Sequence, residues 1–215
     1  MTTSYTSNKR FAPATQRNRE AIRKVLQPRL EHAKIVLEIA SGTGEHAVYM
    51  ARHMPHITWH TSDISPQSLD SIRAWQAETQ LPNLPPPQYI DTQSISWPKT
   101  ETEMWSAQSL EAIVCINMLH ISPWASTQGL FATSSTLLAP QGWLYLYGPF
   151  KRHGQHTAPS NKRFDQDLRS QDPTWGIRDL EQELVPLVQK HRLTLQHVID
   201  MPANNLSVIF TKTTI

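Results

Sequence analysis

VLEIASGTGEH, at residues 36–46, is the stretch from which the rest of the chain can be interpreted. It contains most of an apolar, β-branched run over residues 34–40, which is typical of a buried strand. Gly42 and Gly44 follow in a tight turn, and residues 45–53 then carry apolar side chains at helical spacing. Glycine permits backbone angles that other residues avoid, and it lets a ligand approach the main chain closely. The stretch therefore predicts a strand, a glycine turn and a helix whose start is open to a ligand.

Helices and strands are expected to alternate along the whole chain. The apolar periodicity predicts helices at 15–30, 45–53, 66–79, 123–138 and 177–191, and strands at 34–40, 56–62, 88–91, 110–117, 142–147, 194–199 and 206–212. Such alternation is typical of an α/β fold with a mostly parallel sheet and helices on both faces. The last two strands have no helix between them, so we expect an antiparallel hairpin at the sheet edge.

The length of 215 residues fits one domain over residues 1–215. Residues 1–14 have no clear pattern and are expected to form a flexible N-terminus. Residues 151–176 are polar and irregular in pattern, and we expect them to form a lid or a substrate loop.

Composition narrows the class of protein. Hydrophobic residues make up 39% of the chain and the net charge is +2, without the long basic stripe of a nucleic-acid binder. Cys115 is the sole cysteine and lies in an apolar run, so we interpret it as a core residue of a protein in a reducing compartment. No stretch approaches the roughly 20 apolar residues of a membrane span, and the polar N-terminus is unlike a signal peptide. We expect a cytoplasmic protein that binds neither nucleic acid nor membrane.

Polar side chains recur where the predicted strands end. Glu38 and Ser41 flank the end of the first strand, and Asp63, Asp91 and Asn117 follow the next three. Each could alone be a loop residue or a helix cap. Because ligands of open α/β sheets bind at the carboxyl ends of the strands, we expect these groups to line one crevice.

Two cofactors fit this pattern. Gly42, Gly44 and Ala47, followed by Asp63 about 20 residues later, satisfy the spacing of a dinucleotide fingerprint, in which the acid binds the ribose hydroxyls. Two features favour S-adenosylmethionine over NAD. Glu38 lies inside the first strand, where the dinucleotide pattern has a small or apolar residue, and the terminal hairpin fits a seven-stranded methyltransferase sheet.

Residues 36–46 resemble the first motif of class I S-adenosylmethionine-dependent methyltransferases. More narrowly, the chain resembles a family that includes the human methyltransferase-like protein twenty-six. The segments that carry this resemblance span nearly the whole chain: 17–20, 36–46, 115–124, 146–150, 172–179 and 201–205.

The resemblance implies a Rossmann-like, seven-stranded sheet with order 3-2-1-4-5-7-6. It implies that Gly42 and Gly44 flank the methionine portion of the cofactor, that Asp63 binds the ribose and that Asp91 lies beside the adenine. The complete set of candidate cofactor-binding residues is Arg17, Glu38, Ala40, Ser41, Gly42, Gly44, His46, Asp63, Ile64, Asp91, Thr92, Asn117 and Met118.

Methyl transfer mainly requires alignment of the acceptor, with a base only where the acceptor must lose a proton. His120 follows the fourth strand and is the best candidate base, since an imidazole titrates near neutrality. Tyr147, at the end of the fifth strand, is a second candidate catalytic residue. Structural roles in packing remain open for both. Polar and aromatic residues of the first helix and of the C-terminal region are candidates for binding the substrate: Asn18, Phe150, Asn161, Arg169, Trp175, Arg178 and Asn204.

Four functions remain open, with transfer of a methyl group to a small polar molecule favoured. The others are a cofactor-binding regulatory or scaffold protein, a protein or peptide methyltransferase, and a nicotinamide-dependent oxidoreductase. Methyltransferases that act on nucleobase amino groups typically carry Asn/Asp-Pro-Pro-aromatic after the fourth strand, and residues 117–120 depart from that pattern. The scattered histidines predict no metal site.

Overall fold

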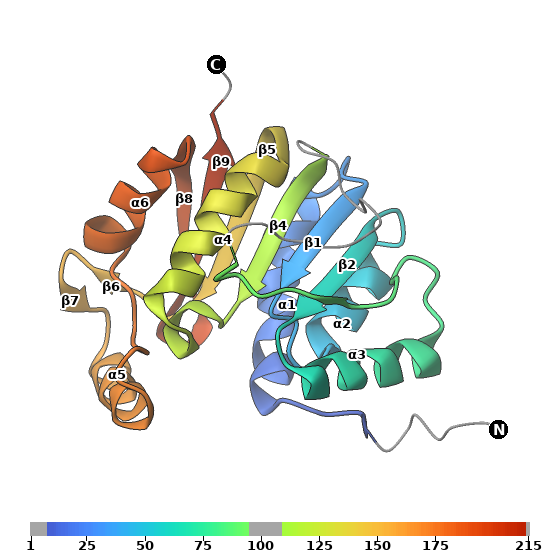
Figure 1. Ribbon diagram of the computed structural model, residues 1–215, viewed down its shortest axis with the longest axis horizontal. Helices are drawn as coiled ribbons and strands as arrows, with labels where there is room; N and C mark the ends of the chain where they lie inside the picture. The colour runs from blue at the N-terminus through green and yellow to red at the C-terminus, as the bar shows by residue number, and fades with distance from the viewer. Residues whose placement is uncertain (1–7, 95–108, 214–215) are drawn as a thin grey trace.

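The computed structural model describes residues 8–94 and 109–213. Its centre is a seven-stranded sheet with the order β3-β2-β1-β4-β5-β9-β8 (Figure 1). The strands are β1 (Ile35–Ile39), β2 (Thr58–Asp63), β3 (Gln88–Tyr89), β4 (Leu110–Ile116), β5 (Leu138–Gly148), β8 (Leu193–Met201) and β9 (Asn205–Lys212). The first five run parallel, and β9 pairs antiparallel with both β5 and β8. The predicted fold class, strand order and terminal hairpin are confirmed.

Helices cover both faces of this sheet. They are α1 (Pro13–Leu26), α2 (Glu45–His53), α3 (Pro66–Thr79), α4 (Trp124–Leu137), α5 (Pro159–Gln171) and α6 (Val185–Lys190). Side chains alternate along each strand. Val36 therefore packs with α1 and α2, whereas Leu37 packs with α4 and α6. Among the described residues, no helix is long and apolar enough to cross a bilayer.

The C-terminal helical region differs from the prediction of one helix over residues 177–191. A π-helical turn at Leu180–Leu184 precedes the short α6, and residues 177–179 are not helical. Pro186 has no N–H to donate to the preceding turn, so a regular α-helix cannot run through this position.

Residues 151–176, which we expected to form a lid or a substrate loop, contain regular secondary structure. A small hairpin of β6 (Lys151–Arg152) and β7 (Gln155–His156) leads into α5, which has 13 residues. Phe164 and Leu168 are its sole large apolar side chains, so the helix has little hydrophobic periodicity to detect in the sequence. Figure 1 shows α5 beyond the same edge of the sheet at which β1 and β4 end.

Candidate active site

The turn after β1 brings main chain to the carboxyl edge of the sheet. Ala40, Gly42 and Gly44 have φ angles of 55°, 58° and 87°. This left-handed conformation costs a residue such as Ala40 about 1–2 kcal/mol. The Ser41 N–H donates to the carbonyl of Ser62 at 2.8 Å and ties the turn to β2. The fold therefore maintains a locally strained turn, a feature that clusters at functional sites.

The two glycines of this turn have different surroundings. A Cβ at Gly42 would meet no heavy atom within 4 Å, so this position faces open space. A Cβ at Gly44 would lie 3.1 Å from Ile72 Cγ1 and 3.3 Å from Trp75 Cδ1 of α3. Gly42 thus leaves room for a ligand, whereas Gly44 allows α2 and α3 to pack closely.

Asp63 ends β2 and faces the same turn. Its Oδ2 accepts the Gly42 N–H at 2.9 Å, and its Oδ1 accepts the Ser65 N–H at 2.9 Å. A carboxylate has about four lone-pair positions, so each oxygen keeps one for a further donor. The carboxylate is therefore held in place with an accepting pair that matches a vicinal diol.

The segment after β3, which contains Asp91 and Thr92, is packed against α4 through a glycine that the sequence analysis missed. A Cβ at Gly129 of α4 would lie 1.7 Å from the carbonyl oxygen of Thr92. The absence of a side chain therefore lets α4 touch the main chain beside Asp91 and Thr92. An isolated glycine inside a predicted helix was the available signal.

Asn117, at the end of β4, completes the row of strand ends. Its φ of 60° is again left-handed, a conformation that asparagine tolerates better than most residues. Its N–H donates to the carbonyl of Tyr147 on β5 at 2.8 Å. The carboxyl ends of β1 and β4 thus share the same unusual backbone geometry.

These groups surround a cavity of about 430 Å³, which is within the usual range for small-molecule sites. Ten of the thirteen candidate cofactor-binding residues line it: Ala40, Ser41, Gly42, His46, Asp63, Ile64, Asp91, Thr92, Asn117 and Met118. Within the described ranges, no group of three or more His, Cys, Asp or Glu residues is arranged to hold a metal ion.

Three candidates lie elsewhere. Gly44 packs against α3, and Arg17 is exposed on α1. Glu38 lies in the interior, where its Oε2 accepts the Trp59 Nε1–H at 2.7 Å. Burial raises the pKa of Glu38 to about 8; the charge of Asp63 adds to this rise and the Trp59 hydrogen bond opposes it. At neutral pH this side chain is therefore mostly a neutral acid.

The N-terminal segment supplies a wall that the sequence analysis did not predict. Ala12, Ala14 and Thr15 line the cavity. The Ala12 N–H donates to Glu45 Oε2 at 2.5 Å, and the Arg10 N–H donates to Ser71 Oγ at 2.9 Å. These contacts hold the residues before α1 against α2 and α3. Residues 1–7 of the expected flexible segment lie outside the described residues.

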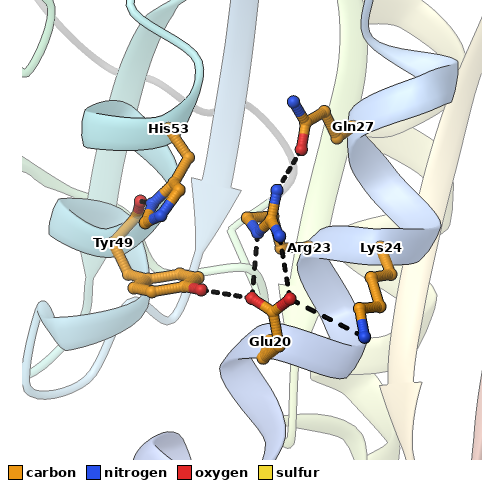
Figure 2. A network of polar contacts seen from close by, with 6 residues as sticks. All are labelled: Glu20, Arg23, Lys24, Gln27, Tyr49 and His53. Atoms are coloured by element: carbon orange, nitrogen blue, oxygen red, sulfur yellow. Dashed lines mark hydrogen bonds and ion pairs between the residues drawn. The ribbon is translucent and has the colours of Figure 1, made fainter.

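A polar network fixes α1 on α2 (Figure 2). Arg23 donates to both carboxylate oxygens of Glu20, through Nε at 3.0 Å and Nη2 at 2.8 Å. The hydroxyl of Tyr49, on α2, also donates to Glu20. The network keeps α1 in place, including the Asn18 side chain that faces α2.

Asn18 is buried between the cavity wall and Tyr147. Its Oδ1 lies 2.8 Å from His46 Nε2, and His46 lines the cavity. Burial raises the pKa of Tyr147, and side-chain hydrogen bonds with Asn18 and Asn205 partly offset this rise. The phenol therefore stays protonated at neutral pH and can donate a hydrogen bond but cannot act as a base.

His120 lies beside the cavity but is not among its lining residues. It sits in a 3₁₀ turn, Leu119–Ile121, and is 6% exposed. A Cβ at Gly148 would lie 3.4 Å from its ring and 3.5 Å from Asn117 Oδ1, so these three groups meet. Burial, aided by the charge of Arg178, lowers the pKa of His120 to about 4. The imidazole is therefore neutral at pH 7 and has a lone pair that can accept a proton, but its lowered pKa makes it a weaker base than an ordinary histidine.

The candidate substrate-binding residues mostly contact one another or the main chain. Phe150 is part of the core, and Asn161 donates to the carbonyl of Asn204 at 2.9 Å. Arg178 is buried and donates to three carbonyl oxygens. Arg169 and Asn204 are exposed, and Trp175 is half-buried. Asn161 and Arg169 lie on α5, and Asn204 contacts that helix, whereas Asn18 lies on α1; none of the seven candidates lines the cavity.

Comparison with solved structures defines the class of fold. The chain matches SibL, an S-adenosylmethionine-dependent methyltransferase, with a TM-score of 0.71 and 17% identity over 93% of this chain and 56% of SibL. It matches human N-acetylserotonin methyltransferase with a TM-score of 0.72 and 14% identity, over 94% of this chain and 53% of that one. It matches YcgJ from Bacillus subtilis with a TM-score of 0.67 and 13% identity, over 89% and 98%. The chain thus spans about half the length of the first two. The molecule has the Rossmann-like fold of class I methyltransferases.

The family follows from the sequence itself. Residues 9–212 match the model of the family described as "Protein of unknown function (DUF938)". The match covers most of the chain, so the protein belongs to the DUF938 family.

Proposed function

We propose that this chain binds S-adenosylmethionine and transfers its methyl group to a small polar acceptor. The observation that carries the proposal is the Asp63 carboxylate, which lines a cavity of about 430 Å³ and is fixed by Gly42 and Ser65 with one acceptor position left on each oxygen. The fold supports it further, because human N-acetylserotonin methyltransferase, which shares that fold, was solved in complex with S-adenosylmethionine.

The residues present fit this cofactor. Asp63 would bind the ribose hydroxyls, and Asp91 and Thr92, with α4 close behind them, would flank the adenine. The open space at Gly42 would receive the methionine portion. When bound, the cofactor supplies a methyl group activated by its attachment to a sulfonium sulfur.

The chain's own contribution would be alignment and, where the acceptor must lose a proton, a base. Neutral His120 next to Asn117 and Gly148 can accept such a proton. Protonated Tyr147 can orient an acceptor by donating a hydrogen bond. We place the protein in the cytoplasm, with a small-molecule partner rather than nucleic acid or membrane, and relate its family to methyltransferase-like protein twenty-six.

Calorimetry on the purified chain with S-adenosylmethionine, its demethylated product and NAD tests the cofactor. We expect the first two to bind and to raise the melting temperature, and NAD to do neither. Asp63→Ala removes two charge-assisted hydrogen bonds, worth about 3 kcal/mol together, and should weaken S-adenosylmethionine binding roughly 100-fold. Asp70→Ala, an exposed acid of α3, is the matched control and should bind as the wild type does. Equal binding by both variants would refute the assignment of Asp63.

Turnover separates the remaining functions. Incubation with isotopically labelled S-adenosylmethionine and a pool of small metabolites should yield a labelled small molecule. Label in protein instead would favour a peptide methyltransferase, and cofactor binding without any product would favour a regulatory role.

A further inference from the structure

The turn that carries His120 is held through its carbonyl groups. Arg178 Nε donates to the carbonyl of Leu119 at 3.2 Å, and Arg178 Nη2 donates to that of Ser122 at 2.7 Å. The Gly176 N–H donates to the carbonyl of His120 at 3.0 Å. One short segment, residues 176–178, thus satisfies three carbonyl oxygens of four consecutive residues. The planar guanidinium suits this task because its donors point in fixed directions.

Arg178 is itself fixed from several sides. It is 7% exposed, its Nη2 also donates to the carbonyl of Thr174 at 3.0 Å, and its guanidinium lies 5.6 Å from the ring of Trp124. Its own carbonyl accepts the Lys151 N–H at 2.9 Å. Contacts with the 119–124 segment, with Lys151 and with Thr174 therefore hold the arginine before any ligand binds.

α5 holds the other end of this segment. Asp165 Oδ1 accepts the Ile177 N–H at 2.6 Å, and Lys151 Nζ lies 3.3 Å from Asp165 Oδ2. A Cβ at Gly176 would lie 2.9 Å from Asp165 Oδ1, so the glycine lets the helix approach this closely. The chain of contacts therefore runs from α5 through residues 176–178 to the turn of His120.

The same helix touches His120 directly. The ring of Phe164 meets the imidazole edge-on, with centroids 5.6 Å apart. No hydrogen bond to the imidazole nitrogens occurs among the described residues, so the ring is placed by packing and by the main chain that carries it. Such a placement leaves both nitrogens free for an acceptor or a water.

We propose that Arg178 is a positioning residue, which fixes the Leu119–Ser122 turn so that the His120 imidazole stays against Asn117 and Gly148 beside the cavity. This inference rests on the proposed function, because it gives His120 a place in methyl transfer. It departs from the expectation that Arg178 binds the substrate, since its Nε and Nη2 donors are already used by three carbonyl groups.

The charges around this arrangement support the proposal. Among the described residues, Arg178 is the charged group that acts on His120, and it lowers the pKa of the imidazole together with burial. Asp165, Arg169 and Glu183 act in turn on Arg178. A variant without the positive charge should therefore let His120 titrate at higher pH.

The test compares Arg178→Lys with Arg178→Met in the full chain. Nuclear magnetic resonance of ¹³C-labelled histidines follows His120, assigned with His120→Gln, and amide exchange follows Gly176. Arg178→Met should raise the His120 titration midpoint by about 1 pH unit, a typical effect of losing a nearby charge. Arg178→Lys keeps the charge but loses the planar fork. It should restore the midpoint while Gly176 exchanges at least ~10-fold faster, as expected for a loosened hydrogen bond.

Arg163→Met, an exposed cation of α5, is the control and should change neither signal. All variants should bind S-adenosylmethionine within 2-fold of the wild type. An unchanged His120 midpoint and unchanged Gly176 exchange in Arg178→Met would overturn the proposal. Loss of cofactor binding in both Arg178 variants would also overturn it, because Arg178 would then support the cavity instead. If Arg178→Met does not fold, Arg178→Lys decides through Gly176 exchange. Failure of the wild type to bind S-adenosylmethionine would refute the proposed function without altering either resonance readout.

Discussion

The two halves of the carboxyl edge of the sheet use their polar groups in opposite ways. At the ends of β1 and β2, Gly42 and Asp63 face a cavity and keep acceptor or donor capacity for a ligand. Beyond β5, Arg178 and Asp165 are buried among main-chain groups that take up most of their hydrogen-bonding capacity. We call the first the cofactor half and the second, from β5 to residue 179, the acceptor half.

Polarity alone therefore does not locate a binding site. A polar group binds a ligand only if it keeps hydrogen-bonding capacity after folding. In the cofactor half, left-handed main chain supplies the space, and the acid is only partly satisfied. In the acceptor half, similar residue types build a polar framework around His120. Variants of the two halves should therefore separate cofactor affinity from stability.

The largest effect on stability is expected at Glu38, which also tests whether a buried residue of β1 takes part in cofactor binding. Its pKa of about 8 lies above the usual 4.5, so the folded state holds a proton that the unfolded chain releases between these values. Stability should therefore fall as pH rises from about 4.5 to about 8, by up to roughly 5 kcal/mol in total. Glu38→Gln should flatten this dependence and be more stable than the wild type at pH 8, as measured by urea unfolding across pH.

Glu31→Gln, an exposed neighbour in sequence, is the control and should keep the wild-type pH dependence. S-adenosylmethionine affinity should remain within 2-fold of the wild type in Glu38→Gln. A large loss of affinity would show that Glu38 contributes to cofactor binding. Its burial in the core would then not separate it from the residues that face the ligand.

Asp165 tests the acceptor half, and here the substitution is expected to destabilise the protein. Asp165→Ala leaves the Ile177 N–H and Lys151 without their partner. Removal of one member of a buried pair is strongly destabilising, so we expect a loss of about 3 kcal/mol in the free energy of unfolding. Cofactor affinity at a temperature where the variant is folded should stay within 2-fold. Asp167→Ala, on the exposed side of the same helix, should cost less than ~0.5 kcal/mol. A weakened cofactor affinity in Asp165→Ala alone would show that the halves are coupled.

The same contrast explains what the sequence could predict. The alternation of strands and helices, the glycine turn and the polar strand ends followed from local patterns, because strand ends in a parallel sheet meet at one edge. The sheet order and the complete set of cofactor-binding candidates, ten of which line the cavity, came from the resemblance to methyltransferases. Glu38 and Gly44 were misplaced because sequence spacing does not say which face of a strand or turn is filled by a neighbouring helix. α5 was missed because its stabilising contacts are polar and long-range, such as Asp165 with Ile177, and leave no apolar period.

Gly42 and Gly44 show the same contrast, between a position that faces the ligand and one that packs in the protein, within a single turn. Gly44→Ala places a Cβ against Ile72 and Trp75 at a φ of 87°, so it should cost about 2–3 kcal/mol of stability through crowding and strain. Gly42→Ala meets open space and should cost only about 1–2 kcal/mol, from its left-handed backbone. The alanine side chain in Gly42→Ala should instead weaken S-adenosylmethionine binding by at least ~10-fold, since this side chain would occupy the proposed methionine site. Thermal unfolding and calorimetry on both variants measure the two effects, and the reverse ranking of affinities would contradict this assignment.

Tyr147 has the smallest expected effect, because it stands at the boundary of the two halves. Tyr147→Phe removes the hydroxyl that contacts Asn18 and Asn205 but keeps the packing of the ring. We expect a loss of about 1 kcal/mol of stability, the usual net contribution of a hydrogen bond. Since Asn18 also contacts His46 on the cavity wall, cofactor affinity should fall by no more than ~3-fold. Tyr145→Phe, which loses a contact with Ser207 deeper in β5, is the matched control and should lose similar stability with no change in affinity. If Tyr147→Phe abolished cofactor binding, the boundary would have to move, and Tyr147 would belong to the cofactor half through Asn18 and His46.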